Sequence, residues 1–169
     1  MPGLFYESVL QALAAAGVRF VVVGGVAVIL HGVPRTTADL DIVADLDREN
    51  LLGLVEVLLG LGFRPRAPVD ARRLAEPEER RRWSEEKGLK AFSFHRADRP
   101  LDAVDVLLDS PVPYEQLARG SVTIQADSLH LRIAAVEDLV AMKLAAGRAQ
   151  DFADADALRR LMGANDELT

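Results

Sequence analysis

The sequence predicts a mixed α/β (α+β) fold, and three observations lead to that prediction. Segments with apolar residues at helical spacing alternate with short Val- and Leu-rich runs that are typical of buried strands. Two of these runs are separated by a short turn, which predicts a hairpin. Half of the 169 residues are hydrophobic and 27% are charged, a composition that suits one sizeable core. We therefore expect a single domain over residues 1–169.

The first elements should be a helix, a central strand and a glycine turn. Residues 4–16 place several apolar side chains on one helical stripe, namely Leu4, Phe5, Val9, Leu10, Leu13 and Ala14. Gly17 follows, where a helix commonly ends. The run FVVV at 20–23 predicts a strand buried on both faces and hence central in a sheet. A short helix over 26–31 and a strand over 40–44 should come next.

The remaining chain continues the alternation of helices and strands. Asp47 is a plausible N-cap for a helix over 47–61. The runs at 90–96 and 101–108 predict the hairpin, and prolines at 65, 68 and 77 divide the preceding segment into loop and short helix. After these come, in order, an expected short helix at 113–119, strands at 122–126 and 129–133, and two helices within 136–161 that are broken near Gly147.

Charge and cysteine content exclude several classes of protein. The 26 acidic and 20 basic residues give a net charge of −6, which argues against coating nucleic acid through bulk positive charge. Without cysteine there is no disulfide, thiolate metal site or cysteine nucleophile. No apolar run is long enough for a membrane helix and the N-terminus lacks a signal-peptide pattern, so we expect a cytoplasmic protein without a membrane partner.

A glycine pair and two aspartates carry the chemistry of the N-terminal half. Gly24 and Gly25 follow a buried strand and precede a helix, and their backbone N–H groups have no Cβ to keep a phosphate away. Asp39 and Asp41 are two residues apart on a strand, so their carboxylates face one side. Such charges repel unless a cation lies between them, and Mg²⁺ prefers oxygen ligands.

Between these two pairs lie further donors for phosphate. Arg35 offers a planar fork of N–H groups, and Thr36 or Thr37 offers a hydroxyl. A glycine turn after a strand is by itself most often only a turn, and an Asp-x-Asp pair is often only a solvated edge. Their combination in this order is much less common, and it favours adjacent phosphate and metal sites.

This combination resembles the motif of the nucleotidyltransferase-fold superfamily, in which a Gly-Gly or Gly-Ser pair, a short helix and an Asp-x-Asp strand precede a third carboxylate. The chain looks like the small bacterial branch of abortive-infection (AbiEii-like) nucleotidyltransferase toxins. Its stretch KLAAGRAQDFADADAL, with Lys143, Arg148, Asp151 and Asp154, is similar to the C-terminal helical motif of that branch. The resemblance implies a mixed β-sheet flanked by helices, followed by C-terminal helices.

The resemblance also implies a third carboxylate on a later strand. Asp105 lies inside the apolar run 101–108, where a charge is costly unless it meets a metal or a partner. We select Asp105, with Asp102 as its competitor, because strand parity alone does not decide between them. His31 and His95 are expected to be structural or surface residues, and His130 is given no role.

By the same resemblance, each candidate residue receives a role. Asp39, Asp41 and Asp105 would be the catalytic residues and would hold two Mg²⁺ ions. The residues that would bind the nucleoside triphosphate are Gly24, Gly25, Arg35, Thr36, Thr37, Lys143 and Arg148. For Lys143 the plainer interpretation is a salt bridge on a helix surface, and the functional one is that it reaches the triphosphate while Asp151 and Asp154 position it.

The implied reaction is transfer of a nucleoside monophosphate from a nucleoside triphosphate to a hydroxyl group on RNA, protein or a small molecule. Arg80, Arg81 and Arg82 beside Trp83 are a candidate surface for an RNA or protein acceptor, although a solvated helix with paired charges is the simpler interpretation. The C-terminal helices, a second subunit of a homo-oligomer, or a partner such as an antitoxin would supply acceptor recognition. The alternatives are a non-catalytic nucleotide-binding or toxin–antitoxin module, and aminoglycoside modification.

Overall fold

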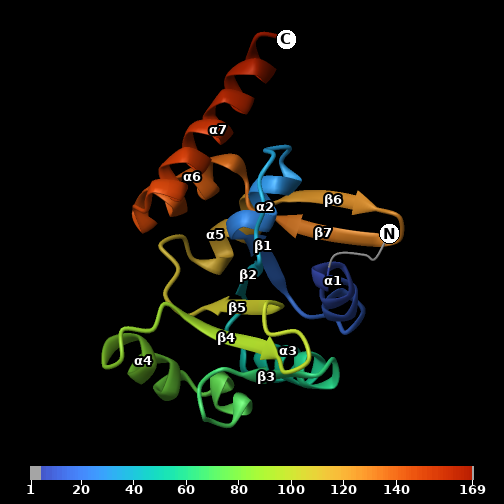
Figure 1. Cartoon of the computed structure of the whole chain (residues 1–169), viewed down its shortest axis with the longest axis vertical. Helices are drawn as coiled ribbons and strands as arrows, with labels where there is room; N and C mark the ends of the chain where they lie inside the picture. Colours follow the sequence, from blue (N-terminus) through green and yellow to red (C-terminus); the bar gives the residue numbers. More distant parts are fainter. Residues whose placement is uncertain (1–4, 169) are drawn as a thin grey trace.

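The computed structural model describes residues 5–168, in which a single seven-stranded mixed sheet is flanked by helices (Figure 1). The strands are β1 (Phe20–Val23), β2 (Asp39–Ala44), β3 (Phe63–Pro65), β4 (Ala91–Arg96), β5 (Ala103–Leu107), β6 (Val122–Ala126) and β7 (Leu129–Ile133). Their spatial order is β3-β4-β5-β2-β1-β7-β6. β2 pairs with β5, and β1 with β7, in parallel, whereas the other neighbours are antiparallel. The mixed α/β class and the central position of β1 are therefore confirmed.

The helices agree with the sequence pattern apart from small shifts at their ends. They are α1 (Phe5–Ala15), α2 (Gly24–Leu30), α3 (Arg48–Gly60), α4 (Pro77–Glu85), α5 (Tyr114–Gly120), α6 (Val136–Ala146) and α7 (Ala149–Asp166), with a 3-10 turn η1 (Ala71–Ala75) before α4. Asp47 caps α3 as predicted, accepting a hydrogen bond from the Asn50 backbone N–H at 3.2 Å. The short strand β3 and the turn η1 were not predicted.

α1 corrects one detail of the predicted stripe. Val9, Leu10 and Leu13 are buried, but Ala14 is exposed and Tyr6 takes part in the core instead. Leu4 lies outside the described residues. The helix ends as predicted before a glycine of left-handed conformation, at φ 71° for Gly17.

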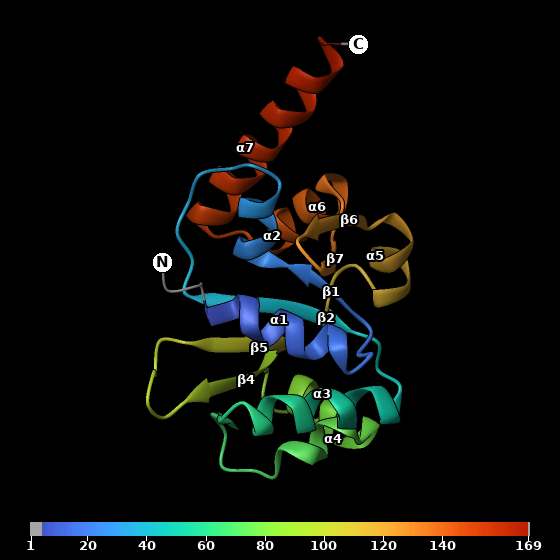
Figure 2. The same cartoon turned by 90° about the vertical axis from the view of Figure 1, so that its right-hand side faces the viewer.

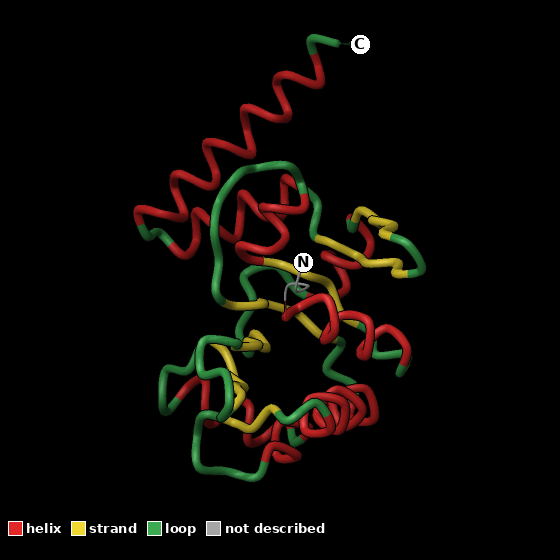
Figure 3. Tube along the Cα trace, turned by 45° about the vertical axis from the view of Figure 1, so that its right-hand side comes forward, coloured by secondary structure: helices red, strands yellow, loops and turns green. Residues whose placement is uncertain are grey.

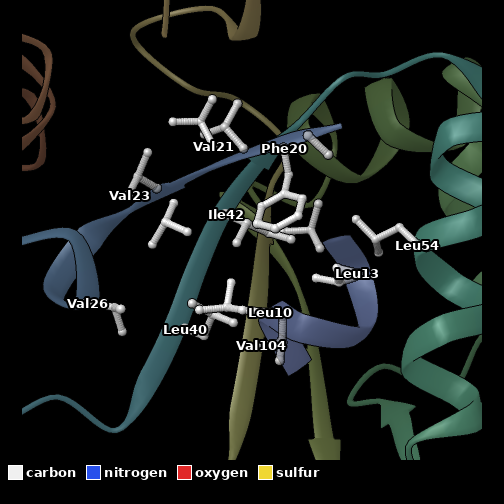
Figure 4. Close-up of a cluster of buried hydrophobic side chains, with 14 of the residues drawn as sticks. Leu10, Leu13, Phe20, Val21, Val23, Val26, Leu40, Ile42, Leu54 and Val104 are labelled. Atoms are coloured by element: carbon white, nitrogen blue, oxygen red, sulfur yellow. The ribbon is translucent and has the colours of Figure 1, made fainter. Parts of the chain in front are cut away.

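The β2–β5 part of the sheet has one apolar face and one polar face. Leu40, Ile42 and Val104 point toward Leu10 of α1 and Leu54 of α3 in the core (Figure 4). Because neighbouring strand residues face opposite sides, the residues between them, which include the candidate carboxylates, lie on the other face. The helices that cover the apolar face therefore leave the polar face free for a site.

The C-terminal helices lie at the opposite end of the molecule from α3 and α4 (Figures 1 and 2). The loop between α2 and β2 rises beside α7 before the chain returns to the sheet (Figures 2 and 3). This loop carries Arg35, so residues far apart in the sequence meet here. None of the helices within residues 5–168 has both the length and the apolar character needed to cross a bilayer.

Candidate active site

The three candidate carboxylates lie on two neighbouring strands. The parallel register of β2 and β5 places Asp41 opposite Asp105, and Asp39 opposite Ala103. Asp39 and Asp41 share a face because they are two residues apart. Asp102 precedes β5, and its carboxylate lies 3.9 Å from the Arg99 guanidinium. The structure thus brings Asp105, and not Asp102, next to the aspartate pair.

The carboxylates interact electrostatically. Burial, followed by the charges of Asp105 and Asp39, raises the pKa of Asp41 from 3.8 to about 7, while Lys143 and Arg148 act in the opposite direction. Burial also raises the pKa of Asp105, against a hydrogen bond from the Ser93 hydroxyl and the charge of Arg66. The fold therefore holds negative charge where it is costly in the absence of a cation.

Gly24 lies directly against Asp41. A Cβ at Gly24 would be 2.1 Å from the Asp41 Oδ2 atom, and the residue has a φ of +65° that side-chain-bearing residues rarely adopt. Gly24 is the first residue of α2, so its backbone lies at the sheet end of that helix. The close approach of carboxylate to bare backbone therefore needs glycine at this position.

The second glycine accommodates the loop before β2. A Cβ at Gly25 would be 2.8 Å from Thr37 Oγ1 and 3.2 Å from the Arg35 guanidinium carbon. The Thr37 hydroxyl donates to the Asp39 backbone carbonyl at 3.3 Å, and Arg35 Nε donates to the Thr36 carbonyl at 3.2 Å. Of these three loop residues, Thr36 is exposed, whereas Arg35 and Thr37 pack on the glycine.

A buried charge network joins this loop to the C-terminal helices. The Arg35 guanidinium forms an ion pair with Asp154. Lys143 Nζ lies 3.3 Å from Asp151 and 2.9 Å from Asp154, and Arg148 Nε lies 2.8 Å from Asp151. Both aspartates are almost fully buried. Three cations therefore surround two carboxylates, which leaves an excess of positive charge. Of these cations, Lys143 and Arg148 act to lower the pKa of Asp41.

The neighbours of Asp151 in this network favour its charged form. Burial opposes ionisation, but hydrogen bonds from Arg148 and Lys143 outweigh it and lower the pKa of Asp151. The same carboxylate accepts from the Arg148 backbone N–H at 3.2 Å and so closes the first turn of α7. The aspartates position Lys143 and Arg148, and these contacts go beyond a surface salt bridge.

A cleft of about 580 Å³ lies between the end of the sheet and helix α6. Its polar lining is Gly24, Asp41, Lys90 and Asp109 on the sheet side and Lys143, Arg148 and Asp151 on the helix side. Its apolar lining is Val23, Ala91, Leu107, Pro111, Leu139, Met142, Ala145 and Ala146. A cleft with a charged end and a long apolar wall can hold a molecule that is itself part anionic and part apolar.

The three aspartates offer the kind of atoms that bind a hard cation, but they do not surround a metal position as they stand. Asp39, Asp41 and Asp105 supply only oxygen atoms, as Mg²⁺ prefers. Within residues 5–168, however, no three Asp, Glu or His side chains converge closely enough to hold a metal ion as they stand. Asp39 is exposed, so its side chain is the least constrained of the three.

Other polar residues singled out in the sequence lie outside this site. His31 Nε2 donates to the Ala134 carbonyl at 2.8 Å and is structural, as expected. Arg81 and Arg82 form ion pairs with Glu78 and Glu79. Trp83 is only 2% exposed and stacks on Phe92, so the indole is not part of a surface for an acceptor.

Two residues near Asp105 were missed in the sequence. Ser93 lies opposite Asp105 on β4, and the backbone N–H of Arg66 donates to the Ser93 carbonyl at 2.9 Å. The signal for Ser93 was present: Phe92 and Phe94 alternate with polar residues, so Ser93 and His95 must share the polar face. Arg66 follows the short strand β3, which was not predicted from the sequence, so no local pattern placed Arg66 next to β4.

Comparison with known proteins shows the family. Residues 8–169 match the family described as "Nucleotidyl transferase AbiEii toxin, Type IV TA system". The chain belongs to this family. It is therefore a nucleotidyltransferase-type protein of the toxin–antitoxin class, as the resemblance implied. A search of curated proteins finds no match.

Solved structures of low sequence identity share the AbiEii-family fold of this chain. The crystal structure of ANT(2″)-Ia in complex with adenylyl-2″-tobramycin has a TM-score of 0.59 at 16% identity, covering 95% of this chain and 89% of that chain. A nucleotidyltransferase-like protein from Paracoccidioides brasiliensis has a TM-score of 0.56 at 17% identity, with coverages of 92% and 73%. At these identities the likeness establishes the nucleotidyltransferase fold and nothing finer.

Proposed function

We propose that this AbiEii-family chain is an Mg²⁺-dependent enzyme that transfers a nucleoside monophosphate from a nucleoside triphosphate to a hydroxyl acceptor. The observation that carries the proposal is the register that sets Asp41 against both Asp105 and the bare backbone of Gly24. It places the candidate carboxylates next to the glycine at the start of α2, and both Gly24 and Asp41 line the cleft. A carboxylate held where its charge is disfavoured, and lining a cleft, is typical of a functional site.

Each wall of the cleft has its own part in this proposal. Gly24 and Gly25 present backbone to the triphosphate, and Lys143 and Arg148 place positive charge opposite Asp41. Arg35 and Thr37 act from behind the glycine pair: they brace Gly25, and the ion pair of Arg35 with Asp154 holds α7 in place. Thr36 is exposed at the rim of this loop and is the remaining candidate for a direct phosphate contact.

The carboxylates Asp39, Asp41 and Asp105 would hold Mg²⁺, two ions in the form that the family resemblance implies. Bound there, Mg²⁺ supplies neutralisation of the charge on the phosphates. The acceptor oxygen forms a bond to the α-phosphorus while the bond from the α-phosphorus to the bridging oxygen breaks. That oxygen leaves with the bonding electrons in pyrophosphate, and the Asp105 carboxylate takes the proton of the acceptor hydroxyl.

The experiment is label transfer. The protein is incubated with α-labelled nucleoside triphosphates, Mg²⁺ and cell extract, and acid-stable label on macromolecules or small molecules is measured. We expect transfer by the native chain, none after addition of EDTA, and none with Asp39→Ala or Asp41→Ala. Asp156→Ala, on the exposed side of α7, is the matched control and should transfer normally.

A negative result would favour the non-catalytic alternative. In that case nucleoside triphosphate should raise the melting temperature without any transfer of label, because a ligand that binds only the folded state stabilises it. Aminoglycosides belong in the acceptor panel, since the structure of ANT(2″)-Ia contains adenylyl-2″-tobramycin. An antitoxin partner is implied by the family resemblance and is tested by the effect of added extract. A homo-oligomer would supply acceptor recognition that a chain of this size has little room for, and size-exclusion chromatography with light scattering tests it.

A further inference from the structure

The polar face of the sheet extends beyond the carboxylates toward β4 and β3. Two rows of cross-strand partners run along it. Asp41, Asp105 and Ser93 form one row, and Asp39, Ala103, His95 and Arg64 form the other. Cross-strand partners share a face, so these side chains continue the surface that carries the candidate metal ligands. The surface lies on the side of Asp105 away from Gly24.

Arg66 is the free cation of this surface. It follows β3 directly, is exposed, and is joined through its backbone N–H to Ser93, the strand partner of Asp105. Among the described contacts its guanidinium has no ion pair, whereas Arg64 donates to the carbonyls of Leu59 and Phe63 at 3.0 and 2.7 Å. The Arg64 guanidinium is thus occupied by backbone carbonyls, whereas the Arg66 guanidinium is available to a ligand.

Ser93 links this cation to the reacting group. It lies opposite Asp105 in the pairing of β4 with β5, and its backbone carbonyl accepts from the Arg66 N–H at 2.9 Å. A group bound by Arg66 is therefore held next to the carboxylate that faces the acceptor hydroxyl. Arg66, Ser93 and His95 are not in the lining of the nucleotide cleft, and neither are Asp39 and Asp105; of the three candidate carboxylates only Asp41 lines it.

We propose that Arg66, with Ser93 and His95, forms the acceptor subsite and selects an acceptor that carries a negatively charged group beside its reacting hydroxyl. The inference rests on the proposed nucleotidyl transfer and adds the charge class of its second substrate. A polycationic acceptor such as an aminoglycoside would meet the guanidinium of Arg66 at close range. Charge complementarity therefore favours an anionic acceptor.

The test separates acceptors by charge before the reaction. Cell extract is passed over an anion exchanger at low salt, and the retained and unretained fractions are each incubated with the protein, α-labelled nucleoside triphosphates and Mg²⁺. We expect label only with the retained fraction and none with tobramycin. For Arg66→Glu, the amount of retained fraction needed for half-maximal rate should rise about tenfold, while half-saturation by the nucleoside triphosphate stays unchanged.

Two variants serve as controls. Arg66→Lys keeps the charge and should retain most of the activity. Arg132→Glu makes the same reversal at an exposed strand arginine on β7, which lies beyond β1 in the sheet, and should behave like the native chain. Labelled acceptors from the unretained fraction, or equal behaviour of Arg66→Glu and Arg132→Glu, would overturn the subsite while leaving the transferase intact. No label with either fraction would overturn the transferase itself, and the subsite with it.

Discussion

Gly24 and Asp41 restrict each other at the scale of single residues. The glycine has a positive φ, and a Cβ at this position would be 2.1 Å from the Asp41 Oδ2 atom, so two separate constraints act on one position. Gly17 has a similar φ, +71°, but nothing lies within 4 Å of the Cβ that it would carry. Comparing alanine substitutions at the two glycines therefore separates the free-energy cost of backbone strain from the cost of the contact with Asp41.

We predict that Gly24→Ala destabilises the fold more than Gly17→Ala does. Each should lose about 1 kcal/mol of unfolding free energy from backbone strain, and Gly24→Ala should lose a further ~1–3 kcal/mol because Asp41 must move. Urea denaturation measures both values. Nucleotide-induced stabilisation should disappear only in Gly24→Ala. Equal losses in the two variants would show that the contact with Asp41 has no energetic weight.

The raised pKa of Asp41 predicts a pH-dependent stability in metal-free buffer. The folded-state pKa of about 7 exceeds the ordinary value of 3.8, so the folded chain binds more protons and stability falls as the pH rises between these values. At about 1.4 kcal/mol per unit, the loss is on the order of 4 kcal/mol.

Asp41→Asn removes this titration. Its unfolding free energy relative to the native chain should increase from about pH 4 to about pH 7 and stay constant above. Chemical denaturation in EDTA across this range measures the difference. Asp156→Asn should show the native profile, and a pH-independent difference for Asp41→Asn would contradict the electrostatic interpretation.

At the scale of elements, α6 and α7 are attached to the sheet domain by charge as well as by apolar contact. Asp154 accepts from Arg35 of the loop before β2, from Lys143 of α6, and from Gln150 at 2.9 Å. Lys143 itself is buried, at 8% exposure. Removing one carboxylate here leaves cations in a low-dielectric environment, which costs more than the pair contributes when intact.

Asp154→Ala should therefore destabilise the fold by about 3–5 kcal/mol. Asp156→Ala, two residues along the same helix and exposed, should change it by less than about 0.5 kcal/mol. Urea denaturation followed by circular dichroism gives both numbers, and hydrogen exchange should show the largest loss of protection in α7. If Asp154→Ala resembled Asp156→Ala, the network would have only a local effect on side-chain position.

At the scale of the whole molecule, the candidate site is formed by two parts of the fold. The sheet supplies the carboxylates and glycines, and the C-terminal helices supply Lys143 and Arg148. α7 then continues past the body of the molecule (Figure 1). Its buried residues all lie in its first ten positions, from Asp151 to Leu158.

Removal of the residues after Gly163 should consequently leave the fold and the cleft unchanged. Residues 164–168 are exposed, so we expect a loss below about 1 kcal/mol in unfolding free energy and normal stabilisation by nucleoside triphosphate. Thermal unfolding with and without nucleotide measures this. A large loss would mean that the end of α7 packs on a second molecule, which light scattering would detect.

Most of the helices and strands, and the residue types of the motifs, are predictable from local patterns in the sequence. The helical stripes, the FVVV strand, the 90–108 hairpin and the Asp-x-Asp pair are local patterns, because burial periodicity and residue chemistry act over a few residues. The short strand β3 was missed because three residues carry too little periodicity. The role of Asp105 stays a proposal, but its position opposite Asp41 followed from strand pairing that no local pattern contains.

Which distant residues meet depends on how the chain folds in three dimensions. The chemistry of Arg35 predicts a phosphate contact, whereas the pairing of its guanidinium with Asp154, which lies 119 residues later, is visible only in the fold. Arg66 was one of many arginines in a basic segment, and strand pairing placed it beside Asp105. Contacts of this kind depend on chain topology, and the free energy that selects among topologies comes from the whole core rather than from any single motif.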